Sequence, residues 1–258
     1  MSKTDIIIVT YQKAELTKRC FESVAANTKD YRVLWIDNGS DEEHVRQIQT
    51  VCDAKLEDWL LFRFDKNLGF ARAVNKGLRQ FLFDEQANYI VLLNNDVIVT
   101  KNWLNYLIEA LESVKFDVIG PVTSEGNFQT LDEIRPQIRS VEIPHFENED
   151  HEERAKMLHD LFGLRIFPVT SLLNFFCVLL TRKAVEETGL FDEQIFAYGE
   201  DNDYCERLKR TGKKLGLSIG TYVHHEHGAT AKLFGDGWID EQRRKAVEYI
   251  RQKYMTLR

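Results

Sequence analysis

The sequence predicts an α/β fold in which a mostly parallel central sheet is flanked by helices. Short apolar runs alternate along the chain with segments whose apolar residues recur every three or four positions, the pattern of strands joined by helical crossovers. The clearest run is 89–93, five apolar residues that are followed directly by three polar ones. So short a run suits a strand buried on both faces of a parallel sheet. No internal repeat or low-complexity linker interrupts the 258 residues, so we expect one domain spanning 1–258.

The first hundred residues are expected to alternate four strands with three helices. The strands are predicted where apolar residues run together, and the helices where apolar residues fall on one face. Strands are predicted at 5–9, 31–36, 59–64 and 89–93. Helices are predicted at 13–27, in a short segment carrying Val45 and Ile48, and at 70–83.

The second part of the chain is less regular. After a helix that carries Leu104, Leu107 and Leu111 and a strand at 116–120, residues 123–168 are polar and weakly periodic. We expect them to form a long surface excursion with one short helix near 152–162, because loops of this length are usually functional or disordered. The remaining predictions are strands at 171–181 and 214–219, helices at 182–188 (closed by Gly189), 201–211 and 239–254, and a Gly- and His-bearing loop at 221–237.

Each of the first four predicted strands ends in a polar loop. The carboxyl ends of parallel strands lie at one edge of a sheet, where open α/β sheets bind their ligands, so these loops should converge on one site. Asp96 is the one ionised group in the triplet Asn94-Asn95-Asp96. A carboxylate beside amides can bind a hard cation, but Asn and Asp are also common turn residues. Both interpretations stand on these residues alone.

Composition excludes several classes of function. The net charge is −7, whereas nucleic-acid binders usually carry a basic face. The N-terminus leads straight into a predicted strand without a signal segment, and no apolar run approaches the ~20 residues of a membrane-spanning helix. The four cysteines lack metal or redox spacing, so we expect reduced thiols in a cytoplasmic protein.

Five separated motifs occur in a specific order along most of the chain, at 7–11, 36–40, 67–77, 94–96 and 199–203. In this order they resemble an inverting glycosyltransferase of family 2, of the bacterial rhamnosyltransferase-like branch, with a Rossmann-like GT-A fold. The resemblance implies transfer of a sugar from a nucleotide-diphosphate donor, a UDP- or dTDP-sugar, to a hydroxyl of a glycan or lipid-linked saccharide. It also implies a nucleotide-sugar half at about 1–100, an acceptor half at about 101–220, and a C-terminal loop and helix at 221–258.

The resemblance assigns the nucleotide to residues from four of these motifs. Asp37 would read the base, since a carboxylate can accept the imide N–H of uracil or thymine; the alternative is a Gly turn. Gly69 would let backbone approach the ligand, and the helix N-terminus behind it could face negative charge. Arg72 would balance phosphate charge or be solvated, and Asn75 would hold the preceding loops or tie helix to sheet. The nucleotide-binding residues expected on this basis are Thr10, Tyr11, Asp37, Asn67, Gly69, Phe70, Arg72, Asn75, Asn94 and Asn95.

The triplet at 94–96 occupies the place of the family's Asp-x-Asp metal motif, but its first acidic position is Asn94. By resemblance Asp96 then carries Mn²⁺ or Mg²⁺, and a His of the C-terminal loop completes the metal shell. His225 fits the family's His-x-x-Gly spacing best, and His227 is a rival. Three histidines and a Glu in four residues also suggest a zinc cluster or a solvated loop.

The motif Gly199-Glu200-Asp201-Asn202-Asp203 resembles the family's Glu-Asp pair before the acceptor-side helix. It makes Asp201 the catalytic base, which takes the proton of the attacking hydroxyl. Glu200 would orient the acceptor or raise the pKa of that base by like-charge repulsion. The alternative is an acidic helix cap, and Asp203 and Arg207, four apart on the helix, would simply pair.

Two other functions are alternatives to sugar transfer. A nucleotidyltransferase would need a basic, Gly-rich first loop, which residues 10–13 lack. A non-catalytic sugar-nucleotide or glycan-binding module is favoured by the missing carboxylate at Asn94. For an enzyme, we expect the segments 123–168 and 221–237 to close over the donor and shape the acceptor cleft. Peripheral contact with the inner face of the membrane is expected by analogy only.

Overall fold

The computed structural model of the chain describes residues 3–123, 129, 150–226 and 233–255. They form a nine-stranded sheet in the order β3-β2-β1-β4-β8-β6-β9-β5, with β7 paired to β9. The strands are β1 (Lys3–Thr10), β2 (Tyr31–Asp37), β3 (Trp59–Arg63), β4 (Ala87–Asn94), β5 (Val97–Val99), β6 (Val118–Val122), β7 (Ile166–Pro168), β8 (Cys177–Thr181) and β9 (Leu215–His225). The helices are α1 (Ala14–Asn27), α2 (Glu42–Lys55), α3 (Phe70–Asp84), α4 (Trp103–Val114), α6 (His151–Phe162), α7 (Arg182–Thr188), α8 (Glu200–Arg210) and α9 (Asp236–Met255).

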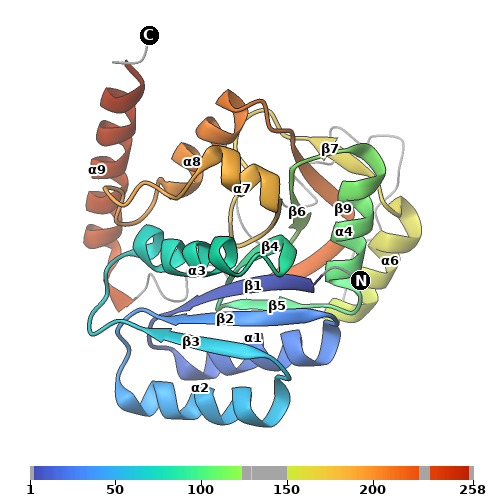
Figure 1. The fold of residues 1–258 in the computed structure, drawn as a ribbon, viewed down its shortest axis with the longest axis horizontal. Helices are drawn as coiled ribbons and strands as arrows, with labels where there is room; N and C mark the ends of the chain where they lie inside the picture. Colours follow the sequence, from blue (N-terminus) through green and yellow to red (C-terminus); the bar gives the residue numbers. More distant parts are fainter. Residues whose placement is uncertain (1–2, 124–128, 130–149, 227–232, 256–258) are drawn as a thin grey trace.

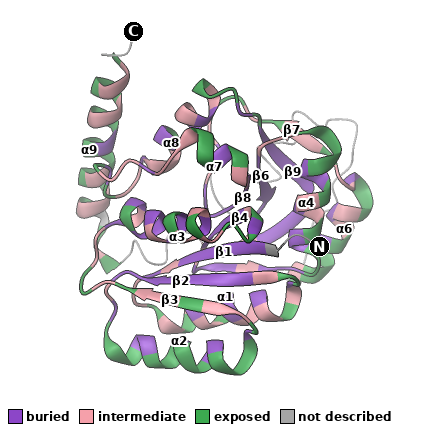
Figure 2. Cartoon of the chain, in the orientation of Figure 1, coloured by how far each residue is buried: buried purple, intermediate pink, exposed green. Residues whose placement is uncertain are grey.

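The first half of the chain is the predicted parallel sheet. β1 pairs in parallel with β2 and β4, and β2 pairs in parallel with β3. Helices α1 and α2 cover one face of these strands and α3 covers the other (Figure 1). The side chains of β1 divide between two cores, Ile7 on the α3 side and Ile6 and Ile8 on the α1 side, as the alternation of a strand requires. Buried residues are concentrated in these central strands (Figure 2).

The second half completes the sheet with mixed directions. The strand predicted at 171–181 is limited to β8, which runs antiparallel to β4. The short strand β5 was not predicted, and it pairs antiparallel with the end of β9. The sheet is therefore mixed: β1 to β4 pair in parallel, β6 and β9 pair in parallel, and β8 joins the two parts through antiparallel pairs with β4 and β6.

The strand predicted at 214–219 is too short, because β9 continues to His225. Polar residues in its second half find partners inside the protein: the Ser218 and Thr221 hydroxyls lie 2.9 Å apart, and Thr100 Oγ1 donates to the Tyr222 carbonyl at 2.6 Å. The predicted loop at 221–237 is therefore wrong at its start. Its residues 227–232 lie outside the described residues.

The segment 123–168 contains the expected helix, α6, which packs against β9. The strand β7 lies at its end, and residues 124–128 and 130–149 lie outside the described part. α9 stands beside α8 at one edge of the molecule (Figure 1). The two helices are tied by Lys253, whose Nζ donates to Asp203 Oδ1 at 2.6 Å. No helix in the described ranges combines the length and apolar composition needed to cross a membrane.

Candidate active site

A cleft of about 570 Å³ lies at the carboxyl ends of β1 and β4. The predicted convergence of distant loops occurs here. From the predicted site, the structure brings to the cleft Tyr11, Asn67, Gly69, Phe70, Asn94, Asn95, Asp96, Glu200, Asp201 and His225. Thr10, Asp37, Arg72 and Asn75 are not among the residues that line it.

The loops after β2 and β3 are locked together at the floor of the cleft. Asn38 Nδ2 donates to Asn67 Oδ1 at 3.1 Å, and the Leu68 N–H donates to Asn38 Oδ1 at 2.9 Å. Gly39 has φ +87°, and a Cβ there would lie 2.4 Å from the Lys66 carbonyl carbon, so only glycine fits. Asn38 lines the cleft but was not singled out from the sequence, although it lies within the motif at 36–40.

Asp37 is fully buried behind this floor. Its carboxylate accepts the Ser40 N–H at 3.2 Å and Arg63 Nε–H at 3.3 Å. Thr10 Oγ1 lies within hydrogen-bonding distance of the same carboxylate at 3.4 Å and accepts Trp35 Nε1–H at 2.8 Å. In this structure Thr10 and Asp37 therefore support the loops that line the cleft. Base reading by Asp37 stays a prediction.

The N-terminus of α3 directly contacts the segment that carries Phe196. Gly69 has φ +87°, and a Cβ there would lie 2.7 Å from the Phe196 carbonyl oxygen. The same oxygen accepts the Phe70 N–H at 3.1 Å. The N-terminus of α3 was expected to face negative charge, and in this structure the N–H of its first residue, Phe70, donates to a backbone carbonyl. The glycine is required for a close approach of two protein segments.

Arg72 and Asn75 hold the same segment from further along α3. Asn75 is buried. Its Nδ2 donates to the Phe191 carbonyl at 3.0 Å, and its Oδ1 accepts the Phe191 N–H at 2.8 Å. Arg72 is about half exposed and lies 3.7 Å from the Glu193 carboxylate. Neither side chain lines the cleft, and contact of either with a nucleotide stays a prediction. Asn75 here ties α3 to the segment that carries Phe191, whereas its alternative was a tie from helix to sheet.

Asp96, just after β4, and His225, at the end of β9, form a buried pair. His225 Nε2 lies 3.1 Å from Asp96 Oδ1, and the Glu226 N–H donates to the Asp96 carbonyl at 2.9 Å. The imidazole stacks on Phe176 with ring centroids 4.8 Å apart. His225 is thus placed by the end of β9 and not by a loop. His227 lies outside the described residues.

The chemistry of this pair fits a divalent cation. A carboxylate and an imidazole lie within contact distance beside the cleft-lining amides of Asn94 and Asn95, and Mg²⁺ or Mn²⁺ accepts such ligands together with substrate phosphates. Asn95 is fixed by its Nδ2, which donates to Thr17 Oγ1 at 2.9 Å. Within the described part of the chain, no three His, Cys, Asp or Glu side chains gather as a closed zinc site would require.

Glu200 and Asp201 begin α8 and face the cleft. Burial and the neighbouring Glu200 carboxylate raise the pKa of Asp201 to about 8, and burial raises the pKa of Glu200. Asp201 Oδ2 accepts the Phe175 N–H, from another segment, at 3.0 Å. Glu200, Asp201 and Asp203 lie in the first turn of α8, as the acidic-cap interpretation predicts, while Asp201 also accepts a hydrogen bond from outside the helix and lines the cleft.

Two contacts fix the start of α8. Gly199 packs against α9, because a Cβ there would lie 2.8 Å from the Ala246 Cβ. Further along α8, Asp203 is buried and accepts Arg207 Nε–H at 2.8 Å, which confirms the expected pair. The catalytic candidates are thus carried by a helix whose start packs against α9.

A row of aromatic rings borders the cleft and was not predicted. Tyr11 and Phe234 stack with centroids 5.7 Å apart, Phe234 and Trp238 at 4.3 Å, and Trp238 meets Phe196 edge-on at 6.1 Å. The rings come from three distant segments, so no local pattern in the sequence relates them.

The chain is similar in sequence to known glycosyltransferases. The family model described as glycosyl transferase family 2 matches residues 5–189. The low-salt glycan biosynthesis hexosyltransferase Agl10 of Haloferax volcanii is 22% identical over 227 residues, which cover 86% of this chain and 66% of that protein. The O-antigen biosynthesis protein RfbC of Myxococcus xanthus is 23% identical over 92% of this chain and 18% of its own length. The chain thus spans less than two thirds of these relatives.

Solved structures share the fold. GalNAc-T7 with UDP, GalNAc and Mn²⁺ superposes with a TM-score of 0.65 at 16% identity, over 87% of this chain and 43% of that one. The mannosyltransferase PcManGT from Pyrobaculum calidifontis, with GDP-Man and Mn²⁺, gives 0.63 at 13% identity, over 89% of this chain and 59% of that one. The predicted GT-A fold is confirmed by these likenesses.

Proposed function

Because this chain belongs to glycosyltransferase family 2, whose model matches residues 5–189, we propose that it transfers a sugar from a nucleotide-diphosphate donor to an acceptor hydroxyl with inversion at the anomeric carbon. One observation carries the proposal: the Asp96–His225 pair and the Glu200–Asp201 pair line the same cleft. Sugar transfer needs both a site for the leaving diphosphate and a proton acceptor for the attacking hydroxyl.

Asp201 is the proposed general base. The acceptor oxygen forms a bond to the anomeric carbon as the bond from that carbon to the diphosphate oxygen breaks, and the hydroxyl proton passes to the Asp201 carboxylate. A pKa raised to about 8 makes this carboxylate a stronger base than an ordinary Asp. The hydrogen bond from the Phe175 N–H holds one oxygen, Oδ2, and leaves Oδ1 for the acceptor.

Asp96 and His225 would hold Mn²⁺ or Mg²⁺, which supplies neutralisation of the charge that develops on the departing diphosphate. Structural neighbours with UDP and GDP-Man, each with Mn²⁺, support a metal-bound nucleotide sugar. Tyr11, Asn67 and Asn94 present the polar and aromatic groups of the nucleotide side. We favour UDP or dTDP, with Asp37 behind the floor as the base-reading group.

The acceptor we propose is a glycan or lipid-linked saccharide. The two curated relatives are named for glycan and O-antigen biosynthesis, which supports surface polysaccharide assembly as the setting. We place the reaction in the cytoplasm, with peripheral contact at the inner face of the membrane, by analogy with the rhamnosyltransferase-like branch.

The test is incubation of the protein with UDP-, dTDP- and GDP-sugars in the presence of Mn²⁺ or Mg²⁺, with release of nucleoside diphosphate as the readout. We expect slow hydrolysis of one donor, abolished by a chelator and restored by the metal. The competing proposal is a non-catalytic binding module, favoured by Asn94 in place of a first carboxylate. Saturable donor binding without turnover, in the presence of metal and of glycan acceptors, would establish that alternative.

A further inference from the structure

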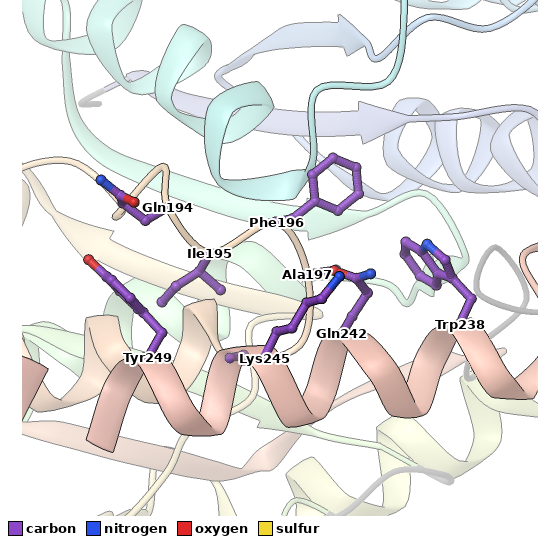
Figure 3. Close-up of a pocket in the computed structure, with 9 residues that line it drawn as sticks. Gln194, Ile195, Phe196, Ala197, Trp238, Gln242, Lys245 and Tyr249 are labelled. Atoms are coloured by element: carbon purple, nitrogen blue, oxygen red, sulfur yellow. The ribbon is translucent and has the colours of Figure 1, made fainter. Parts of the chain in front are cut away.

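A second cavity of about 550 Å³ adjoins the active-site cleft, between residues 194–197 and α9. Figure 3 shows the side chains of Trp238, Gln242, Lys245 and Tyr249 projecting from the helix toward this segment. These positions are separated by four, three and four residues, so they share one face of α9. At 1.5 Å per residue the face is about 16 Å long. The cavity is therefore a groove along the helix, which we call the α9 groove.

The α9 groove shares a wall with the cleft. Phe196, Ala197 and Trp238 line both spaces. α9 also packs directly against Gly199, the residue before Glu200. A ligand whose reacting end lies at Asp201 can thus continue into the groove without leaving the protein surface.

The side chains of the groove suit a sugar. Tyr249 and Trp238, one face of which already stacks on Phe234, lie near the two ends of the groove, and the apolar faces of pyranose rings pack on aromatic rings. Gln194 and Gln242 offer amides, which donate and accept hydrogen bonds as hydroxyl groups require. The volume lies within the ~300–1,000 Å³ that is typical of small-molecule sites.

The charge of the groove favours an uncharged ligand. Among the described residues that line it, Lys245 is the one charged side chain. Its Nζ lies 2.6 Å from Glu241 Oε1, so its charge is already paired. A phosphate or a carboxylate sugar would have to compete with Glu241 for this one cation, whereas a neutral saccharide would not.

We propose that the α9 groove is an acceptor subsite that binds one or more uncharged sugar rings of the acceptor, on the side remote from the reacting hydroxyl. The inference rests on the proposed sugar transfer and extends it to acceptor length. An acceptor that fills both spaces gains contacts that a single sugar at Asp201 does not make. The enzyme would therefore select neutral oligosaccharides over the corresponding monosaccharides.

The test uses neutral mono-, di- and trisaccharides of glucose, galactose, mannose and rhamnose, with binding measured by saturation-transfer NMR and titration in the absence of donor. We expect at least one trisaccharide to bind the wild type more tightly than its monosaccharide. Gln242→Ala should weaken that trisaccharide about three- to tenfold, the loss of one or two hydrogen bonds, and Gln242→Trp should block it by filling the groove. Gln252→Ala, an exposed Gln on the same helix outside both cavities, is the matched control and should bind like the wild type.

Absence of binding by every saccharide would overturn the inference, as would equal binding by wild type, Gln242→Ala and Gln242→Trp. Tighter binding of an acidic oligosaccharide than of any neutral one would also overturn it. Donor hydrolysis by the wild type is measured separately without any saccharide. Loss of hydrolysis alone refutes the proposed function, and loss of saccharide binding alone refutes the subsite.

Discussion

Replacing Asp201 by Asn should remove sugar transfer and at the same time stabilise the protein at alkaline pH. The substitution removes one negative charge beside Glu200 and keeps the shape of the side chain. The Phe175 N–H, which donates to Asp201 Oδ2 at 3.0 Å, can donate to the amide oxygen instead. The variant should therefore fold normally, and its donor binding should survive.

The size of both effects follows from the site. Loss of a general base lowers the rate by about 10²- to 10⁴-fold. For stability, burial and Glu200 raise the pKa of Asp201 to about 8 in the folded state, above its ordinary value of 3.8. The folded carboxyl keeps its proton where the unfolded one has lost it, so this group makes folding less favourable as pH rises from about 4 to 8. The whole shift is not converted into stability, because the carboxyl faces an open cleft and solvent screens it. A shift of one pKa unit corresponds to about 1.4 kcal/mol of the free energy of unfolding.

The assay pairs turnover with thermal unfolding of wild type and variant at pH 4 and pH 9. The Tm of Asp201→Asn should exceed that of the wild type by about 3–5 °C at pH 9, with little difference at pH 4. The control is Asp240→Asn, the same change at an exposed site of α9, which should alter neither property. Near-normal transfer would refute Asp201 as the base. An equal gain at both pH values, or a loss at pH 9, would refute the pKa argument.

Three further variants test the rest of the site. Glu200→Gln removes the carboxylate that helps raise the pKa of Asp201, so the acid limb of the pH–rate profile should move to lower pH by about one unit; an unmoved limb would show that the two carboxyls do not interact. Asp96→Asn should abolish the stimulation of donor hydrolysis by Mn²⁺, a loss of about 10²-fold or more, and calorimetry with Mn²⁺ and UDP should show weaker binding; retained stimulation would exclude Asp96 as the ligand. Gly69→Ala should lower stability by about 1–3 kcal/mol in denaturant titrations because its Cβ meets the Phe196 carbonyl oxygen at 2.7 Å. Gly212→Ala, with a similar φ of +74° but open space around it, should cost less, and equal losses would show that the contact is unimportant.

The first half of the fold was predictable because its determinants are local. The runs that became β1 to β4 are mostly apolar, and the helices between them carry apolar residues at helical spacing. Parallel pairing then dictates that the carboxyl ends meet at one edge. For this reason Tyr11, Asn67 and Asp96 could be placed together from the sequence.

The second half depends on contacts between distant residues. β9 extends through Thr221, a polar residue in the predicted loop, because its hydroxyl bonds to that of Ser218 inside the sheet. Gly220 lies against Gly163, where a side chain would collide with the backbone. Similarly, β8 enters antiparallel to β4, a direction that its own apolar composition does not specify.

Some motif residues act as supports in this structure, and the same reasoning explains why the sequence alone does not reveal this role. A polar residue after a strand is needed both to contact a ligand and to hold the next loop, so residue type cannot separate the two roles. What separates them is whether the hydrogen-bonding groups are already used. The Asn75 amide both donates to and accepts from the Phe191 backbone, and Asp37 is bound by Ser40 and Arg63. Asp201 instead faces the cleft with a raised pKa, a carboxyl that the fold disfavours in its charged form and that is therefore suited to accept a proton.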